Sequence, residues 1–232
     1  MKEEMAQKVF EAASSENVAL SVHAPYYINL NSAEKEKIEA SVKRIYESAR
    51  IGALCGAESI VFHPAYYHKD SSEKVYSRVS WLLGDLSSRL AEKNINAVLR
   101  PETTGKPSQF GSLEELLQLS SEIEGVLPCI DFAHLHARSG GEENSYEKFS
   151  YTLSRVEDIL GREGLDDMHI HISGIEYSPK GEQKHLNLEE SDLNYTELMQ
   201  SFKDFDLKGL VICESPNLEG DALLLKNTYD SL

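Results

Sequence analysis

The sequence predicts an α/β protein with a parallel sheet, because short apolar runs alternate with longer segments of helical periodicity. This strand-then-helix alternation is repeated six times along the 232 residues. The hydrophobic content of 41% is enough to bury a large core. Since the chain contains no low-complexity segment and no obvious linker, we expect a single domain over residues 1–232.

The six expected strands are short apolar runs rich in β-branched side chains. They cover residues 18–22, 58–62, 95–99, 126–130, 167–172 and 210–214. Each strand is followed by a segment long enough for one helix, which is the pattern of βαβ units.

The expected helices show amphipathic periodicity and recognisable end signals. They cover residues 1–15, 32–55, 71–94, 112–124, 145–160, a segment that opens at 194 and a last one from about 220. Gly56 is expected to end the second helix, and Ser71 or Ser72 to cap the third. Ser112 and Glu115 have the spacing of a capping box. We expect residues 173–193 to form a long loop.

The chain is strongly acidic, with 39 Asp and Glu against 23 Lys and Arg and a net charge of −16. Nucleic acid would be repelled at long range unless bound metal ions supply local positive charge. Cys55, Cys129 and Cys213 lack CxxC spacing and are interpreted as small core residues of a reducing compartment. With no apolar run near the ~20 residues of a membrane span and no signal peptide, we expect a cytoplasmic protein.

The expected strands end on side chains of the types that bind metal ions. In chain order these are His23, His63, Glu102, Asp131, His171 and Glu214, spaced 29 to 43 residues apart. In a parallel α/β barrel the carboxyl ends of the strands share one face, so these side chains should converge. Imidazole together with carboxylate favours Zn, Mn or Fe. Taken singly, each has an ordinary alternative, such as a packed histidine or an Asp131 that caps the next helix.

The remaining histidines differ in what their positions predict. His169 and His171 lie on the same face of one strand, and His171 is the expected ligand because it is nearer the carboxyl end. His134 and His185 lie on segments at the same end, which suggests more than one ion. We expect the other two, His68 and His136, at the surface.

The motifs at these positions resemble those of endonuclease IV, the zinc-dependent nuclease family that acts at abasic sites (AP endonuclease family 2). The matching stretches begin at His23 (HAPYYINL), Phe62 (FHP), Glu102 (ETTG), Cys129 (CIDFAH) and Glu214 (ESP), together with His171 and His185. The resemblance covers essentially the whole chain. It implies a TIM-type barrel of the xylose-isomerase-like group and a cluster of three zinc ions.

The resemblance also implies a role for each residue. One zinc would be held by His23, His63 and Glu102, and Glu102 would bridge to a second zinc. The other ligands of the second zinc would be Asp131, His171 and Glu214, and those of the third would be His134 and His185. Tyr26 and Tyr27 match a loop that wedges into the DNA minor groove, although ordinary loop packing is an alternative for both.

Three features depart from the family pattern. Gln183 stands where the family has an aspartate ligand of the third zinc, so either the neighbouring Glu182 substitutes or that site lacks its carboxylate. Arg100 and Pro101 precede Glu102 where apolar residues are usual. The first two strands of the family have no counterpart, which leaves six strands of eight and two open sheet edges that an oligomer could cover.

These residues predict hydrolysis of the phosphodiester 5′ to an abasic site in double-stranded DNA, the incision step of base excision repair. Two zinc ions about 3.5–4 Å apart would activate a water and stabilise the leaving oxygen. Glu102, as the bridge, and Glu214, orienting the nucleophile, are the expected catalytic residues. Two alternatives stay open, namely a sugar isomerase or epimerase with one Mn²⁺ ion and a non-catalytic metal- or DNA-binding relic.

Overall fold

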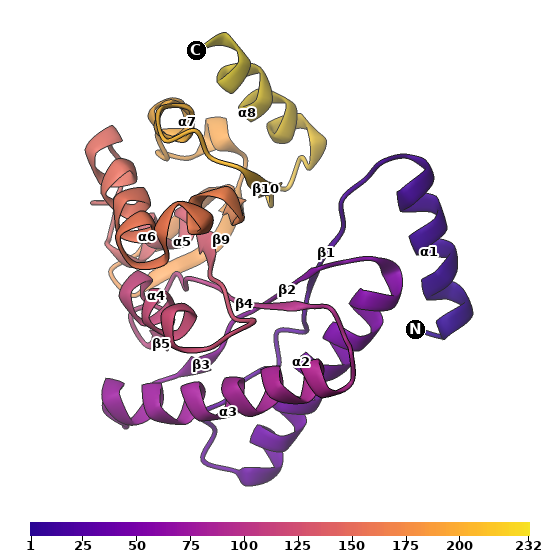
Figure 1. Ribbon diagram of the computed structural model, residues 1–232. Coiled ribbons are helices and arrows are strands. Elements are labelled where there is room, and N and C mark those ends of the chain that lie inside the picture. Colours follow the sequence, from indigo (N-terminus) through magenta and orange to yellow (C-terminus); the bar gives the residue numbers. More distant parts are fainter. The chain divides into compact units, whose positions relative to one another are not determined.

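The computed structural model describes residues 1–232, which divide into two compact units. The first unit consists of Met1–Glu102 and Gln118–Pro128, and the second of Thr103–Leu117 and Cys129–Leu232. Each unit contains one three-stranded parallel sheet (Figure 1). The division into units does not test whether residues 1–232 form a single domain, so that expectation stays a prediction.

The sheet of the first unit is made of three parallel strands in the order β1-β2-β4. Their bounds are Ser21–His23, Ser59–Phe62 and Val98–Pro101. The register pairs His23 with Val61, and Phe62 with Pro101. The carboxyl ends of all three strands therefore lie at one edge of this sheet.

The helices of the first unit end where the sequence signals predict. They are α1 (Glu3–Ser15), α2 (Lys35–Cys55) and α3 (Ser72–Glu92), and β3 (Ala65–Tyr66) is a short strand between α2 and α3. Gly56 ends α2 with a φ of +82°, which favours glycine, and a side chain there would also meet the ring of Phe10 on α1. Ser71 caps α3 by accepting a hydrogen bond from the Lys74 amide.

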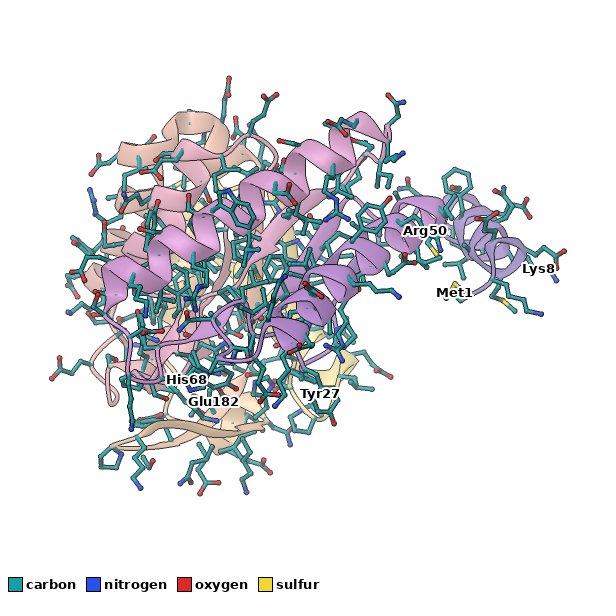
Figure 2. All side chains as sticks on the ribbon, turned by 90° about the horizontal axis from the view of Figure 1, so that it is seen from below. Met1, Lys8, Tyr27, Arg50, His68 and Glu182 are labelled. Atoms are coloured by element: carbon teal, nitrogen blue, oxygen red, sulfur yellow. The ribbon has the colours of Figure 1, made fainter.

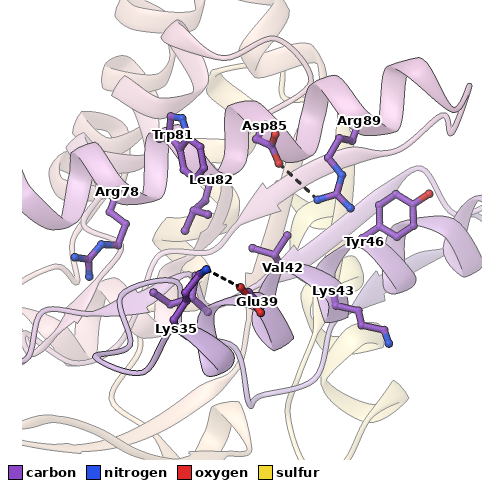
Figure 3. A pocket seen from close by; sticks show the side chains of 11 residues that line it. Lys35, Glu39, Val42, Lys43, Tyr46, Arg78, Trp81, Leu82, Asp85 and Arg89 are labelled. Carbon is purple, nitrogen blue, oxygen red and sulfur yellow. Dashed lines mark ion pairs between the residues drawn. The ribbon is translucent and has the colours of Figure 1, made fainter.

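A groove of about 660 Å³ runs between α2 and α3 (Figure 3). Trp81 lines it and is 70% exposed. The ion pairs Lys35–Glu39 and Asp85–Arg89 also flank the groove, with N···O distances of 3.5 Å in both. Exposed pairs of this kind contribute about 0.2–1 kcal/mol each to stability. The packing of the two helices therefore depends mainly on their apolar faces.

The sheet of the second unit is parallel in the order β10-β7-β6. The bounds are Cys129–Asp131 for β6, Met168–Ile172 for β7 and Gly209–Cys213 for β10. The register pairs Asp131 with His171, and His171 with Ile212. Each unit thus contains three parallel strands, and β1 and β10 are edge strands of their own sheets, which confirms the predicted α/β class.

Helices and a 3-10 turn surround the sheet of the second unit (Figure 1). They are α5 (Phe132–Arg138), α6 (Tyr146–Asp166), η1 (Leu188–Glu190), α7 (Tyr195–Asp204) and α8 (Glu219–Ser231). The ring of Phe132 packs against those of Phe149 and Phe202, with centroids 5.9 and 5.4 Å away. None of the helices in the chain combines the length and the apolar character that crossing a membrane requires.

Two shorter elements lie near the boundary between the units along the chain. Strand β5 covers Gln109–Phe110, and helix α4 covers Leu113–Glu122. The predicted capping box is present, because the Ser112 amide donates to the Glu115 carboxylate and the Glu115 amide donates to the Ser112 hydroxyl.

The segment expected to be a long loop is instead an antiparallel hairpin, so that prediction was wrong. Strand β8 covers Gly174–Ser178, and β9 covers Gly181–Leu186. The second strand reads GEQKHL, which is polar and lacks the apolar alternation that indicates a strand from sequence. Gly181 begins β9 with a φ of +95°. The hairpin matters because it carries His185.

The expectation that His136 lies at the surface was also wrong, whereas His68 is exposed as predicted. His136 is fully buried on α5, and its Nε2 lies 2.9 Å from Asp192 Oδ1. The Tyr177 hydroxyl donates to the other oxygen of Asp192 at 2.7 Å, and this hydrogen bond raises the pKa of Tyr177. Asp192 thus ties α5 to the β8–β9 hairpin.

Asp221 on α8 offers a test of how charge stabilises the second unit. Its carboxylate accepts hydrogen bonds from the Leu188 amide at 2.7 Å and from the Asn217 side chain at 2.8 Å. Burial opposes ionisation, but hydrogen bonding with Ser215, Asn217 and the Leu188 amide outweighs it and holds the pKa of Asp221 below its usual value. Because the pKa is lower in the folded state, ionised Asp221 stabilises the fold at pH values above the unfolded-state pKa of about 3.9. This stabilisation is lost as the pH falls through the folded-state pKa.

We therefore expect Asp221→Asn to lower the free energy of unfolding at neutral pH by about 1–3 kcal/mol. The difference from the unaltered protein should shrink below about pH 4. Urea unfolding at neutral and acid pH measures both effects. Asp230→Asn, at an exposed ion pair on the same helix, is the control and should change stability by less than about 1 kcal/mol. A deficit independent of pH would contradict the role of the charge.

Candidate metal centre

The first group of candidate ligands lies at the carboxyl edge of the first unit's sheet. His23 ends β1, while His63 and Glu102 directly follow β2 and β4. Both histidine Nε2 atoms lie close to Glu102 Oε2, at 3.1 Å for His23 and 3.0 Å for His63. The two imidazole centroids are 5.6 Å apart. Two nitrogen atoms and one carboxylate oxygen therefore converge on a single point.

The carboxylate of this group is held in a costly environment. Glu102 is fully buried, whereas His23 and His63 are partly exposed. Burial of an ionised carboxylate is unfavourable unless it is paired or coordinates a metal ion. A divalent cation between these three ligands would offset that cost, so the donor set fits such an ion.

A second group lies at the carboxyl edge of the other sheet. Asp131 ends β6, His171 lies near the end of β7, and Glu214 follows β10. Each offers a ligand atom, and these atoms lie within 4.8 Å of one another. His171 Nδ1 is 3.4 Å from Glu214 Oε2. This set contains two carboxylates and one imidazole, which suits a harder ion than the first set does.

Asp131 also caps a helix, so both interpretations of this residue from sequence are compatible. Its Oδ1 accepts a hydrogen bond of 2.6 Å from the His134 amide at the start of α5. Its own amide donates to the Thr103 hydroxyl at 2.8 Å, which fixes the main chain at Asp131. Asp131 is thus a candidate ligand and also the cap of α5, the helix that carries the candidate ligand His134.

The third group joins α5 to the β8–β9 hairpin. It consists of His134, Glu182 and His185, whose ligand atoms lie within 4.8 Å of one another. His134 Nε2 is 3.6 Å from Glu182 Oε2, and the two imidazole centroids are 5.8 Å apart. Glu182 therefore provides a carboxylate beside the two imidazoles, whereas Gln183 alone would have left this group without one.

A β-bulge explains how Glu182 reaches this place. Neighbouring pairs of the hairpin ladder are Glu176–Lys184 and Tyr177–Glu182. Gln183 has no pair in this ladder and is the extra residue of a bulge. In an unbroken strand, residues two apart share a face, so residue 183 would lie beside His185. The extra residue shifts the alternation by one and turns Glu182 to that face instead.

Gly105 makes room for the Glu182 side chain. The Glu182 amide donates to the Gly105 carbonyl at 2.9 Å. A side-chain carbon added at Gly105 would lie 2.6 Å from the Cβ atom of Glu182, which is closer than such atoms approach. The close contact therefore requires glycine at this position, within the ETTG stretch singled out from sequence.

Three of the candidate histidines are oriented in the same way by the backbone. The Nδ1 atom of each lies near a carbonyl oxygen, at 2.8 Å for His23 with Ala24, 2.9 Å for His134 with Thr103 and 3.2 Å for His185 with Glu214. A ring that donates from Nδ1 to a carbonyl keeps its lone pair on Nε2. Metal-binding histidines are typically fixed in this manner.

Tyr26 and Tyr27 lie on the loop after His23, and their side chains are 76% and 83% exposed. The Tyr26 ring lies 5.4 Å from the His23 ring, and Tyr27 is exposed at the surface (Figure 2). Arg44 donates to the Tyr27 carbonyl at 3.2 Å and anchors the loop. Such exposure argues against the loop-packing alternative.

All eight histidines and carboxylates predicted as ligands belong to one of these three groups. Sequence analysis raised Glu182 only as an alternative and interpreted Cys129, which is paired with His169 below the second group, as a core residue only. The expected bridging role of Glu102 stays a prediction. Arg100, noted as unusual before Glu102, is buried and directs its Nε to the Ser59 hydroxyl at 3.2 Å.

Comparison with known families defines the class of protein. The family described as the xylose isomerase-like TIM barrel matches residues 1–228, so the chain belongs to this family. This confirms the fold class predicted from sequence. The first two ligand groups stand at the carboxyl ends of the parallel strands, where this class of fold places its functional sites.

Several relatives of known sequence match the chain. An uncharacterized protein of Methanocaldococcus jannaschii is 49% identical over 232 residues, covering 100% of this chain and 84% of that protein. A probable endonuclease 4 of Aquifex aeolicus is 29% identical over 157 residues, covering 66% of this chain and 55% of the relative. A probable endonuclease 4 of Carboxydothermus hydrogenoformans is 27% identical over 221 residues, covering 92% and 76%.

Solved structures show the same fold at low identity. A D-tagatose 3-epimerase-like protein has a TM-score of 0.76 at 18% identity, covering 99% of this chain and 82% of its own. Endonuclease IV from Thermus thermophilus has a TM-score of 0.69 at 21% identity, with the same coverage. The IOLI protein, whose structure contains a zinc atom, has a TM-score of 0.69 at 14% identity, covering 97% and 79%.

The bulged hairpin predicts that Glu182 is a metal ligand and Gln183 is not. We expect Glu182→Ala to weaken zinc binding at the third group by about 10-fold or more, as loss of supporting groups alone typically costs about 10–100-fold. Gln183→Ala should leave it unchanged. Zinc titration against a chromophoric chelator measures the difference, and Glu176→Ala on the same hairpin is a control. Equal zinc affinity in all three variants would contradict the assignment.

Proposed function

We propose that this protein is a zinc-dependent phosphodiesterase of the endonuclease IV type, which cleaves DNA on the 5′ side of abasic sites. The proposal is supported by the ligand groups and by the two relatives described as probable endonuclease 4. The likeness to endonuclease IV from Thermus thermophilus supports the fold on which such a site is built.

One observation carries the proposal, namely the imidazole-rich groups that accompany the second group. The second group already provides two carboxylates and an imidazole, and an enzyme with one ion needs little more. The other groups add His23, His63, His134 and His185, three of them held by backbone carbonyls. A chain that orients this many additional imidazoles is suited to several ions of the zinc type.

The residues have distinct roles in this proposal. His23, His63 and Glu102 would hold the first ion, and Asp131, His171 and Glu214 would hold the second. Glu214 would also orient the attacking water, and His134, Glu182 and His185 would hold the third ion. Zinc supplies Lewis acidity, which lowers the pKa of a bound water and neutralises charge on the phosphodiester.

The proposed substrate has to approach a chain with a net charge of −16. Divalent ions provide positive charge at the place where a phosphate must bind. Tyr26 and Tyr27 offer exposed aromatic rings, that of Tyr26 next to His23, and aromatic side chains stack well on unpaired bases. Double-stranded DNA with an abasic site presents both a phosphodiester and a gap in the base stack.

A sugar epimerase with a single Mn²⁺ ion is the second candidate. It is supported by the second group, whose two carboxylates suit Mn²⁺, and by the TM-score of 0.76 with the D-tagatose 3-epimerase-like protein. That likeness at 18% identity supports the fold and not the substrate. The two candidates differ in the number and kind of ions and in the substrate that is turned over.

Metal analysis combined with a nicking assay tests the proposal. We expect zinc-loaded protein to hold more than one ion per chain and to nick a duplex 5′ to a synthetic abasic site. His63→Ala should reduce nicking by about 100-fold or more, since weaker perturbations around a metal cost about 10–100-fold. His68→Ala, at an exposed histidine, is the matched control and should retain full activity.

The possible outcomes separate the candidates. A single bound Mn²⁺ with sugar epimerisation and no nicking would replace the nuclease by the epimerase. Tight binding of the abasic duplex by zinc-loaded protein without turnover would indicate the non-catalytic relic. Nicking that survives His63→Ala would refute the assignment of the first group.

The exposed tyrosines predict a separate effect on DNA binding. Tyr27→Ala should weaken binding of an abasic duplex by about 1–3 kcal/mol, the usual contribution of one stacked ring, with unchanged zinc content. Fluorescence anisotropy with abasic and intact duplexes measures this. Tyr151→Ala, at an exposed tyrosine of α6, is the control. Equal affinity of both variants would show that the loop does not contact DNA.

A further inference from the structure

A second layer of ligand-type side chains lies beneath the second group. The register of β6 and β7 pairs Asp131 with His171, and one step below it pairs Cys129 with His169. Because residues two apart on a strand share a face, all four side chains lie on the same side of the sheet. The upper pair belongs to the second group, whereas the lower pair has no role in the proposed hydrolysis.

The geometry of the lower pair together with His171 resembles an ion-binding site. Cys129 Sγ and one nitrogen each of His169 and His171 lie within 4.8 Å of one another. Ligands on one zinc-sized ion are separated by about 3.3–3.8 Å, as follows from Zn–S near 2.3 Å and Zn–N near 2.0 Å. The His169 and His171 rings lie 5.4 Å apart.

The surroundings favour a soft ion at this place. All three residues are at most 2% exposed, and the neighbouring strand pairs Leu210 with His169 and Ile212 with His171. This lower layer contains no carboxylate, in contrast to the upper one. Thiolate and imidazole ligands in apolar surroundings select thiophilic ions such as Cu⁺ over Mg²⁺, Ca²⁺ or Mn²⁺.

We propose that Cys129, His169 and His171 form a fourth site, which binds one thiophilic metal ion and shares His171 with the second group. Binding deprotonates the Cys129 thiol and takes one lone pair from each imidazole. Since His171 is shared with the second group, an ion in the lower layer competes for this imidazole with an ion in the upper one. The site thus binds soft ions at the expense of the harder ion above it.

Cd²⁺ is a suitable probe because it is thiophilic, keeps one oxidation state and is observable as ¹¹³Cd by NMR. The full-length, reduced, metal-free protein is titrated with Cd²⁺. We expect an ultraviolet thiolate-to-cadmium charge-transfer band and a ¹¹³Cd resonance shifted to the range of one sulfur with nitrogen ligands. Cys129→Ser should abolish both signals. Cys213→Ser, at a cysteine on the neighbouring strand, should keep both.

A second variant keeps the test decisive if Cys129→Ser does not fold. His169→Gln retains every cysteine, so loss of the ¹¹³Cd signal in this variant cannot come from a missing thiol. A charge-transfer band that persists in folded Cys129→Ser or in His169→Gln would overturn the proposal. So would a ¹¹³Cd spectrum of the unaltered protein with resonances only in the nitrogen and oxygen range.

Discussion

Parallel pairing within each three-stranded sheet brings the carboxyl ends of neighbouring strands to one edge, and the candidate metal centre depends on this constraint. His23 ends β1, Glu102 follows β4, and Asp131 and His171 are paired across β6 and β7. In the second unit, Ile130, Ile170 and Ile172 are buried in the apolar core, which fixes the strands that carry Asp131 and His171. Ligands separated by tens of residues in sequence thereby converge with little conformational freedom left to lose when an ion binds.

Backbone carbonyls orient three of the candidate imidazoles, so the rings are positioned without a bound ion. His23, His134 and His185 take these hydrogen bonds from different neighbours, namely Ala24, Thr103 and Glu214. Two of these carbonyls belong to, or lie next to, another candidate ligand. Thr103 directly follows Glu102, and Glu214 is itself a candidate ligand. The third group is consequently linked to the second through the main-chain carbonyl of Glu214.

The strand ends were predictable from sequence because each short apolar run ends abruptly on an imidazole or a carboxylate. Helix boundaries at Gly56, Ser71 and Ser112 were predictable for a similar local reason, since capping depends on side chains within three residues. The β8–β9 hairpin was not, because its second strand is polar and its register is set by a bulge at Gln183. Burial of His136 depends on Asp192, which lies 56 residues away, and no local pattern indicates such a partner. The features that sequence patterns did not predict therefore depend on polar contacts between residues far apart in the chain.

The cap that Asp131 provides for α5 has a thermodynamic consequence for ion binding. One carboxylate both accepts the His134 amide and offers an oxygen beside His171 and Glu214. An ion that draws this carboxylate toward the sheet changes the hydrogen bond at the start of α5, and with it the position of His134. If each group holds an ion, binding at the second group would change the affinity of the third, and by linkage an ion at the third group would change the affinity of the second by the same factor.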